Sequence, residues 1–325
     1  MIATLGAFLE TVAVLAAASA LASFAVLPAL AGVRRLRLAP AVRADLALAA
    51  AALPAGAVVV VAVAVAFPSA LDLLGFVADH CDDHGGHGHL CLAHPGVAAP
   101  SLVAIGALVV ASTLLRAGRW VATRAAAARD LAALLRLGVP AAEGPDVVCV
   151  DGRTVLCHAA GAWAPRVLVS TRLIAGLPAE LLSAALEHER AHVRRRDVLA
   201  RDVLTVLGLL AWPGVLSAAV AAWEQAAEEA ADAAAAARFG GPLTARTLIA
   251  VARMSLSPAP AAMPIVGARL EQRVRALLDR PPRHRPALAL VAVPALFVGL
   301  VPLAALNAEP LHHAAETALH YILEA

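Results

Sequence analysis

The sequence contains few charged residues and no lysine. Only 15% of its 325 residues are charged, whereas a soluble domain has about 25%. Hydrophobic residues make up 61% of the chain, and the mean hydropathy is +0.78. A chain of this length cannot hide so much apolar surface in one core, which excludes an ordinary soluble globule, a disordered protein and a small disulfide-stapled domain. The composition therefore predicts a protein whose main solvent is the lipid bilayer.

Aromatic residues and net charge are also low. Aromatic residues are 3% of the chain, and its 26 basic residues are all arginine. We attribute the arginine bias to a GC-rich coding sequence, as in a GC-rich bacterium. The net charge is only +2. Because nucleic-acid-binding domains usually carry a concentrated basic face, we do not expect direct binding of nucleic acid.

Four uncharged runs are long enough to cross a membrane, which takes about 20 apolar residues. They lie at about 11–33, 46–71, 97–115 and 286–308. The first run has no basic segment before it and is longer than the apolar part of a signal peptide. We therefore expect a transmembrane helix there and not a cleaved leader.

The arginines indicate the orientation of these spans, because short cytosolic loops collect basic residues. They occur between the first two spans and from Arg116 to Arg285, but none lies in the loop 72–96 or after residue 308. The sequence thus predicts a multi-pass protein of the cell membrane with both termini outside. Its expected parts are three transmembrane helices within 1–117, a cytosolic domain at 118–285, a fourth transmembrane helix at 286–308 and a short extracellular tail at 309–325.

A fifth apolar run, 203–222, is also about 20 residues long, but we do not expect it to span the membrane. If it did, the arginines from Arg238 to Arg275 would move outside, against the charge rule. Pro213 and Gly214 interrupt its centre, where proline removes a helical hydrogen bond and glycine permits a turn. We predict a helical hairpin that either enters the cytosolic side of the membrane or caps the cytosolic domain.

The cytosolic segment has a more ordinary composition and predicts an α+β domain. Short β-branched runs at 146–150 and 166–170 favour a small sheet or hairpin. From Leu181 onward the pattern becomes helical. The expected fold class is a mainly α polytopic membrane protein, with this α+β domain between the third and fourth spans.

The helix after Leu181 contains an HExxH motif, His-Glu-Arg-Ala-His. His188 and His192 are four residues apart and share one helix face, so both imidazoles can reach a single zinc ion. Glu189 is placed to accept a proton from a metal-bound water, whose pKa zinc lowers to about 7. The motif therefore predicts one catalytic zinc ion with Glu189 as general base.

A catalytic zinc site has three protein ligands and one open position, so a third ligand must come from elsewhere. The candidates are the cytosolic acids after the hairpin and one later histidine: Glu224, Glu228, Glu229, Asp232, Glu271, Asp279 and His284. Glu228 and Asp232 are four residues apart in an Ala-rich helix. We predict that Glu228 binds zinc and that Asp232 orients a ligand histidine. Glu229 is expected to be a solvated charge.

These features resemble the BlaR/MecR-type integral-membrane zinc metallopeptidases, peptidase family M-56. The family has four spans with an HExxH domain between the third and fourth. Its HExxH followed by basic residues and an aspartate is similar to 188–197, and its ExxxD motif is similar to 228–232. The resemblance implies a zincin-like domain and adds Asp197 to the residues expected behind the ligands.

Two other segments fit the same family. The stretch 164–170 is similar to a part of related zinc peptidases that includes an edge strand able to pair with an extended substrate. The stretch 269–274 resembles the Arg-rich helix before the last span. The likeness covers about residues 1–308.

The resemblance implies zinc-dependent endoproteolysis of a cytosolic protein, often a small winged-helix repressor whose cleavage switches on transcription. Members that sense β-lactams carry a penicillin-binding domain after the last span, with a Ser-x-x-Lys nucleophile. This chain has only 309–325 there and no lysine. Sensing of β-lactams by this chain is therefore not expected, and its signal stays open.

The loop 79–96 contains five histidines and two cysteines. One interpretation is a disulfide between Cys81 and Cys91, which an oxidising exterior permits. The other is a metal or pH sensor, because neutral imidazoles bind metal ions and become charged near pH 6.5. Cys149 and Cys157 are cytosolic in the predicted topology and are expected to be reduced core residues.

Two other function classes are a membrane sensor or scaffold and a metal transporter. The chain could be a non-catalytic membrane sensor or scaffold that keeps a structural zinc site and responds to metal through its outer loop. A metal transporter is disfavoured, because the four predicted spans contain no ionisable residue of the kind that marks an ion path.

Overall fold

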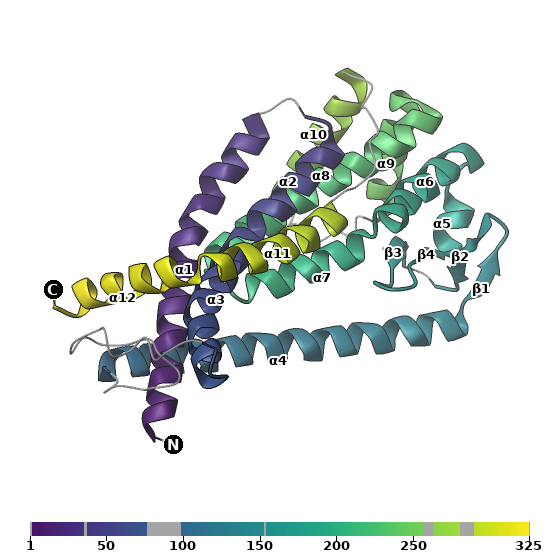
Figure 1. Ribbon diagram of the computed structural model, residues 1–325. Helices are drawn as coiled ribbons and strands as arrows, with labels where there is room; N and C mark the ends of the chain where they lie inside the picture. The colour runs from purple at the N-terminus through teal and green to yellow at the C-terminus, as the bar shows by residue number, and fades with distance from the viewer. Residues whose placement is uncertain are drawn as a thin grey trace.

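The computed structural model describes residues 2–35, 38–76, 99–152, 154–255, 263–279 and 289–324. One end of the molecule is formed by α1 (Ile2–Arg35), α2 (Pro40–Ala51), α3 (Leu53–Leu73), the first part of α4 (Pro100–Leu137), α11 (Ala289–Leu306) and α12 (Ala308–Glu324). The other end contains β1 (Val139–Ala141), β2 (Gly144–Val150), β3 (Cys157–Ala160), β4 (Arg166–Ser170), α5 (Thr171–Gly176), α6 (Ala179–Arg195), α9 (Gly241–Ser255) and α10 (Met263–Asp279). Two helices, α7 (Asp197–Gly208) and α8 (Pro213–Phe239), connect these ends (Figure 1).

Among the described residues, three helical stretches are long and apolar enough to cross a membrane: Leu5–Arg35 in α1, Pro40–Leu71 from α2 into α3, and Pro100–Leu137, which is α4. These stretches contain all of the predicted runs 11–33 and 46–71 and most of 97–115, and each stretch is longer than its run. The fourth predicted run differs, because its described part ends at a bend of 79° between Val293–Leu306 and Ala308–Thr317. The stretch predicted as a short tail is therefore helical in its described part, and α12 packs against α3.

The helix α4 continues well past the apolar run from which it was predicted. It is one unbroken helix of 38 residues, because its Ala-, Leu- and Arg-rich second half has no helix breaker before Gly138 and Pro140. At 1.5 Å per residue it is roughly 57 Å long. Its one buried residue is Gly106, where an added Cβ would lie 1.9 Å from the Leu9 carbonyl oxygen of α1. α4 thus crosses α1 closely and then runs to the sheet (Figure 1).

The predicted hairpin is present as α7, a short turn and the first part of α8. The break predicted at Pro213 is confirmed, since this proline stands in the first turn of α8. The two helices approach closely at Gly208, where an added Cβ would lie 2.2 Å from Leu216. Arg116 of α4 donates to the Leu209 carbonyl oxygen at 2.7 Å. A turn between two helices has free carbonyl groups, and Arg116 satisfies one of them.

The hairpin packs on the membrane helices, and its turn reaches the middle of α1. Ser19 donates to the Leu210 carbonyl oxygen, and the Trp212 amide donates to Ser23 Oγ at 3.3 Å. A buried apolar cluster then joins α1, α2, α7, α8 and α11: Val26, Leu30, Ala44, Ala47, Leu48, Ala50, Ala51, Ala52, Ala200, Leu204, Val215, Ala219, Ala222, Trp223, Ala226, Ala227 and Val293. The position of α8 is therefore fixed by the membrane helices.

The four strands form one sheet in the order β1-β2-β4-β3. The predicted strands at 146–150 and 166–170 are confirmed as parts of β2 and β4, and they pair in parallel. The expectation that 164–170 includes the edge strand is wrong, because β4 lies between β2 and β3. The two edge strands are β1 and the four-residue β3, and the edge next to β4 is β3, whose short mixed sequence gave no alternating pattern.

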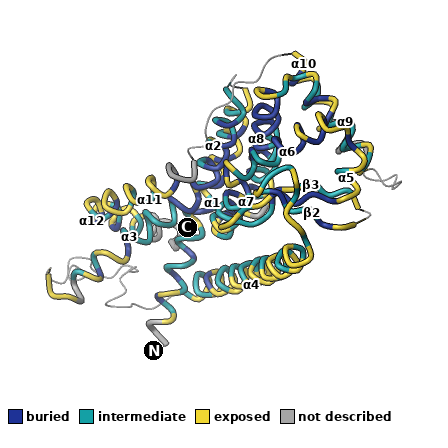
Figure 2. The backbone as a smooth tube through the Cα atoms, turned by 90° about the vertical axis from the view of Figure 1, so that its right-hand side faces the viewer, coloured by how far each residue is buried: buried dark blue, intermediate teal, exposed yellow. Residues whose placement is uncertain are grey.

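One face of the sheet packs on α6 through a second apolar core. Its members are Val147, Val167, Val169, Leu173, Leu177, Leu181, Leu182 and Leu186. Figure 2 shows the buried segments of α6 and α8 inside the molecule, whereas much of α4 is exposed. Cys81 and Cys91, together with the rest of the loop 79–96, lie outside the described residues.

Candidate metal centre

The helix α6 presents the HExxH motif on the face opposite its apolar core. Glu180 lies in its first turn, where a carboxylate favours the helix N-terminus. Leucines on one side pack against the sheet, so the histidines face α8. The Nε2 atoms of His188 and His192 are 3.2 Å apart, and their ring centroids are separated by 4.9 Å. The predicted pairing of the two imidazoles on one helix face is therefore confirmed.

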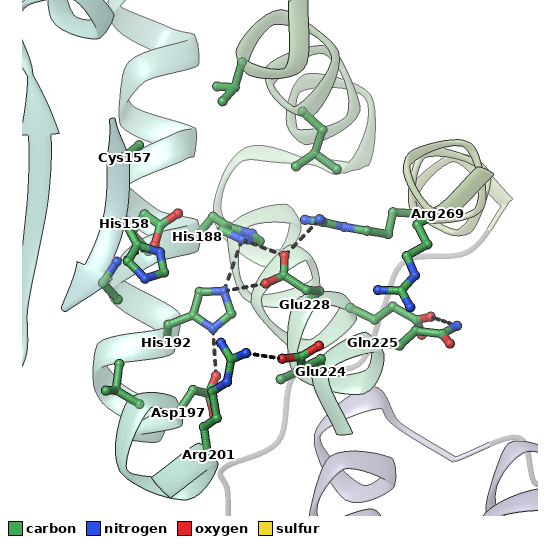
Figure 3. Close-up of a pocket in the computed structure, with 18 of the residues that line it drawn as sticks. Cys157, His158, His188, His192, Asp197, Arg201, Glu224, Gln225, Glu228 and Arg269 are labelled. Atoms are coloured by element: carbon green, nitrogen blue, oxygen red, sulfur yellow. Dashed lines mark hydrogen bonds and ion pairs between the residues drawn. The ribbon is translucent and has the colours of Figure 1, made fainter. Parts of the chain in front are cut away.

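Glu228 of α8 completes a group that could hold a metal ion (Figure 3). Its Oε2 lies 3.6 Å from Nε2 of His188, and its Oε1 lies 3.6 Å from Nε2 of His192. One ligand atom from each residue lies within 4.8 Å of the others. Two nitrogens and one carboxylate oxygen are a donor set that zinc commonly takes.

Alanines allow the two ligand helices to approach each other. Ala191 of α6 forms a buried cluster with Ala231 and Ala234 of α8. Side chains as small as methyl groups keep the helix axes close, so the glutamate of one helix can reach the histidines of the other. The Ala-rich sequence of α8 thus serves the site as well as the fold.

An aspartate lies behind each histidine, as predicted. Asp232 Oδ1 is 3.0 Å from Nδ1 of His188, and Asp197 Oδ2 is 2.7 Å from Nδ1 of His192. Asp197 reaches its histidine because Arg196, with φ of 54°, turns the chain sharply between α6 and α7. The contact with Asp197 is a hydrogen bond that fixes the orientation of the His192 ring, and in both histidines the aspartate lies at Nδ1 and leaves Nε2 free for a metal ion.

Glu189 faces the same cleft and contacts the edge strand. Its Oε2 accepts a hydrogen bond of 2.8 Å from the amide of Ala159 in β3. This contact fixes the carboxylate beside the metal group without placing it among the three candidate ligands. Glu189 therefore lines the cleft next to the two histidines and outside the group of three that could hold a metal ion.

A cleft of about 820 Å³ opens in front of these residues. It is lined by α4, β3, α6, α7, α8, α9 and α10. In Figure 3, His158 of β3 and Arg269 of α10 lie on opposite sides of Glu228. The volume lies in the upper part of the range for ligand sites, about 300–1,000 Å³.

Arg273 of α10 is a site residue that sequence reasoning missed. It contacts both Asp232 and Glu228 through its guanidinium group. The only signal was the resemblance of 269–274 to an Arg-rich helix, which did not distinguish Arg273 from its two arginine neighbours.

In the metal-free site, buried charges shift the pKa values of His188 and Glu228. Burial opposes a charge on His188, but contacts with Asp232 and Glu228 outweigh it and raise the pKa of His188 to about 10. Burial also opposes ionisation of Glu228, yet contact with His188 and the charge of Arg273 lower the pKa of Glu228. The metal-free protein therefore holds a proton on His188 at neutral pH, and binding of a metal ion must release it.

We expect the metal-free protein to lose thermal stability as the pH rises from 6.5 to 9. His188 has an ordinary pKa of 6.5 and a folded pKa of about 10. The folded state keeps a proton that the unfolded chain loses, so this stabilisation is complete below pH 6.5 and declines above it. The buried Cys157 thiol, whose pKa is also raised by burial, adds to this trend only near and above its ordinary value of 9.0.

The measurement is the Tm of the chelator-treated protein across this pH window. His188→Gln should flatten the decline, because it removes the titrating group. A Tm of the unsubstituted chain that stays constant from pH 6.5 to 9 would contradict the assignment.

The expectation that Glu229 is a solvated charge is wrong. Its side chain is 10% exposed, forms an ion pair with Arg43 of α2 and accepts a hydrogen bond of 3.1 Å from Gln225. The adjacent Glu228 faces the histidines, whereas Glu229 faces the membrane helices. Helix packing at α2, which local sequence does not encode, decides this burial.

Removal of Glu229 is therefore expected to destabilise the fold without loss of metal. Glu229→Ala leaves Arg43 without its partner, which should lower the free energy of unfolding by up to about 3 kcal/mol. The test is thermal unfolding together with the bound-metal content. Glu229→Ala combined with Arg43→Ala should recover part of the loss. An unchanged Tm, or a lost metal ion, would show that the pair has another role.

Cys149 and Cys157 are free and pack against the apolar core of the sheet, as predicted. The predicted runs contain no ionisable residue, but the helix that contains the first run begins before it and includes the buried Glu10. Glu10 accepts a hydrogen bond from the Ala99 amide at the start of α4, so it has a structural partner.

Residues 101–275 match the sequence profile of a family described as BlaR1 peptidase M56. The matched region runs from α4 into α10 and includes His188, His192 and Glu228. No curated protein and no solved structure matches the chain.

Proposed function

Because the chain belongs to the BlaR1 peptidase M56 family, we propose that it is a membrane-embedded zinc endopeptidase that cleaves a cytosolic protein. The observation that carries this proposal is the convergence of His188, His192 and Glu228 beside Glu189 in one open cleft. A purely structural zinc site is closed by its protein ligands, whereas this group leaves a position for water and substrate.

Zinc held by His188, His192 and Glu228 would supply a Lewis acid and activate water at neutral pH. Glu189 would take the proton from the attacking water and deliver it to the leaving amine. Asp197 and Asp232 would keep the two histidines in the tautomer that presents Nε2. Glu189 is within reach of this task once substrate displaces its contact with the Ala159 amide.

The edge strand β3 supports an extended polypeptide as substrate. In its antiparallel pairing with β4, the Leu156 carbonyl oxygen accepts from Ser170, and His158 stands opposite Leu168. Alternate residues of β3 therefore direct their backbone groups away from the sheet, as the Ala159 amide does toward Glu189. An extended segment could add to this edge and bring its peptide bond to the metal group.

We further propose that the site faces the cytosol at the membrane surface and that the hairpin turn lies within the membrane. Arginine distribution supports the orientation. Ser19 and Ser23, which bind the turn, lie among the exposed apolar side chains of α1, and Trp212 at the turn is 65% exposed. Glu228 is 16 residues along α8 from this turn, or roughly 24 Å.

Thiol labelling can test the depth of the turn. In a chain whose native cysteines are replaced by serine, Trp212→Cys in membranes should react with a lipid-soluble maleimide but not with a charged one. A cysteine at Glu180, on the exposed start of α6, should react with both. Equal reaction of the two reagents at position 212 would place the turn in water.

The family resemblance supports a transcriptional repressor, such as a winged-helix protein, as the substrate of a signal-responsive cleavage. The first experiment compares new protein N-termini in cells that express the unsubstituted chain or Glu189→Ala. Termini that require Glu189 would establish proteolysis and identify the substrate. If both proteins bind zinc but no terminus depends on Glu189 under several stresses, the chain is instead a non-catalytic sensor or scaffold.

A role of the outer loop in metal sensing would then be tested by metal binding to the loop peptide, and an affinity weaker than millimolar would exclude it.

A further inference from the structure

Arg273 contacts both Glu228, the third candidate ligand, and Asp232, which lies behind His188. Its Nε donates to Asp232 Oδ2 and its Nη2 to Asp232 Oδ1, both at 2.7 Å. Its Nη1 lies 2.9 Å from Glu228 Oε2. The side chain is 20% exposed, and the guanidinium is thus held by two carboxylates that both contact His188. A planar group with a fixed fork of donors specifies the position of both carboxylates.

Each histidine contacts an aspartate, and each aspartate contacts an arginine, but the two chains of contacts differ. Behind His192, Asp197 accepts from Arg195 at 3.2 Å, and the buried Nη1 of Arg195 has no hydrogen-bond partner among the described residues. Behind His188, all three donating nitrogens of Arg273 are used, and one of them reaches a metal ligand. Only the second chain of contacts returns to the metal group.

The contact with Arg273 restricts the number of Glu228 oxygens that can bind a metal ion. A carboxylate has two oxygens and can bind a metal ion through one or both. Arg273 lies on Oε2, which is 3.6 Å from Nε2 of His188, whereas no arginine in the described part of the chain lies on Oε1, which is 3.6 Å from Nε2 of His192. We propose that Arg273 is a positioning residue that keeps Glu228 a one-oxygen ligand and so preserves an open coordination position. The inference rests on the proposed zinc peptidase.

The location of Arg273 makes its contacts with the two carboxylates sensitive to movement of α10. Arg273 lies on α10, which precedes the membrane-associated helices α11 and α12 along the chain. A displacement of α10 would withdraw the guanidinium from Glu228 and Asp232 together. The positions of both carboxylates therefore depend on the position of α10.

The test is the electronic spectrum of Co²⁺ bound to the purified full-length chain in detergent. We expect the intense d–d bands of four-coordinate Co²⁺ in the unsubstituted protein. In Arg273→Gln, the second oxygen of Glu228 becomes available, and the bands should weaken to those of five coordination. Turnover should fall about 10–100-fold, with most of the change in kcat and not in KM.

Two further variants keep the test decisive. Arg275→Gln is the matched control, because Arg275 is on the same helix and forms only an exposed pair with Glu271. It should give the unsubstituted spectrum. Arg273→Lys retains a charge near Asp232 but not the fork, so it should keep the fold and still give the weaker bands. It replaces Arg273→Gln as the deciding variant if that protein does not fold.

The outcomes separate this inference from the proposed function. If both substitutions at Arg273 leave the Co²⁺ spectrum unchanged and alter only the Tm, Arg273 is structural and the inference is wrong. If the unsubstituted chain binds neither Co²⁺ nor Zn²⁺, the zinc-peptidase proposal itself fails. Weaker bands with normal metal stoichiometry support the inference even before a protein substrate is known.

Discussion

Glu189→Gln is expected to reduce proteolysis about 10²–10⁴-fold while the protein keeps its metal ion and its fold. Glutamine has the shape of glutamate, and its side-chain oxygen can still accept the hydrogen bond from the Ala159 amide. It cannot take a proton from water, so the loss should fall on the chemical step. Cleavage of the substrate found through its new N-terminus, measured in proteoliposomes with the zinc content, gives the result.

The matched control for this variant is Glu180→Gln on the same helix. Glu180 lies at the exposed start of α6, two turns before the motif, and should be close to neutral for cleavage. Turnover of Glu189→Gln equal to that of the control would remove Glu189 from the mechanism. Loss of zinc from Glu189→Gln would instead make it a ligand.

Glu228→Ala is expected to abolish cleavage and to lower zinc affinity sharply. The two histidines would then be the only protein ligands, one fewer than the number that holds zinc in catalytic sites. The effect should exceed the 10–100-fold typical of residues behind the ligands. Zinc content after dialysis against a weak chelator, with activity on the same samples, measures both losses.

Two neighbours on α8 serve as controls for Glu228→Ala. Glu224 is one turn earlier and pairs with Arg201 at 2.9 Å, so Glu224→Ala should retain the metal ion. Glu229→Ala should also retain it, although the protein should be less stable because Arg43 loses its partner. If Glu229→Ala lost zinc and Glu228→Ala did not, the ligand assignment would move by one residue.

Much of the site was predictable because its parts repeat along single helices. His188 and His192 share a face of α6, and Glu228 and Asp232 share a face of α8, at the same spacing of four residues. Helix geometry alone places such pairs together. That these two pairs meet each other was an inference from zinc chemistry and from the family resemblance, and the packing of α6 on α8 confirms it.

Other features could not be predicted because they depend on contacts between distant segments. Arg273 is 41 residues from Asp232, and Arg43 is 186 residues from Glu229. An arginine in a charged stretch looks the same in the sequence whether it faces solvent or a buried carboxylate. Strand order was also hidden, since β3 becomes the edge only when β4 pairs on its other side with β2.

The sequence by itself determined the membrane character, the apolar helices and the residue types of the metal group. Hydropathy and helical periodicity are properties of consecutive residues, so they can be read without the fold. The tertiary structure alone decided which carboxylates face the histidines, which face the membrane helices and which arginine holds each of them. Helix packing brings these charges together over long sequence distances, and burial then makes each pairing specific.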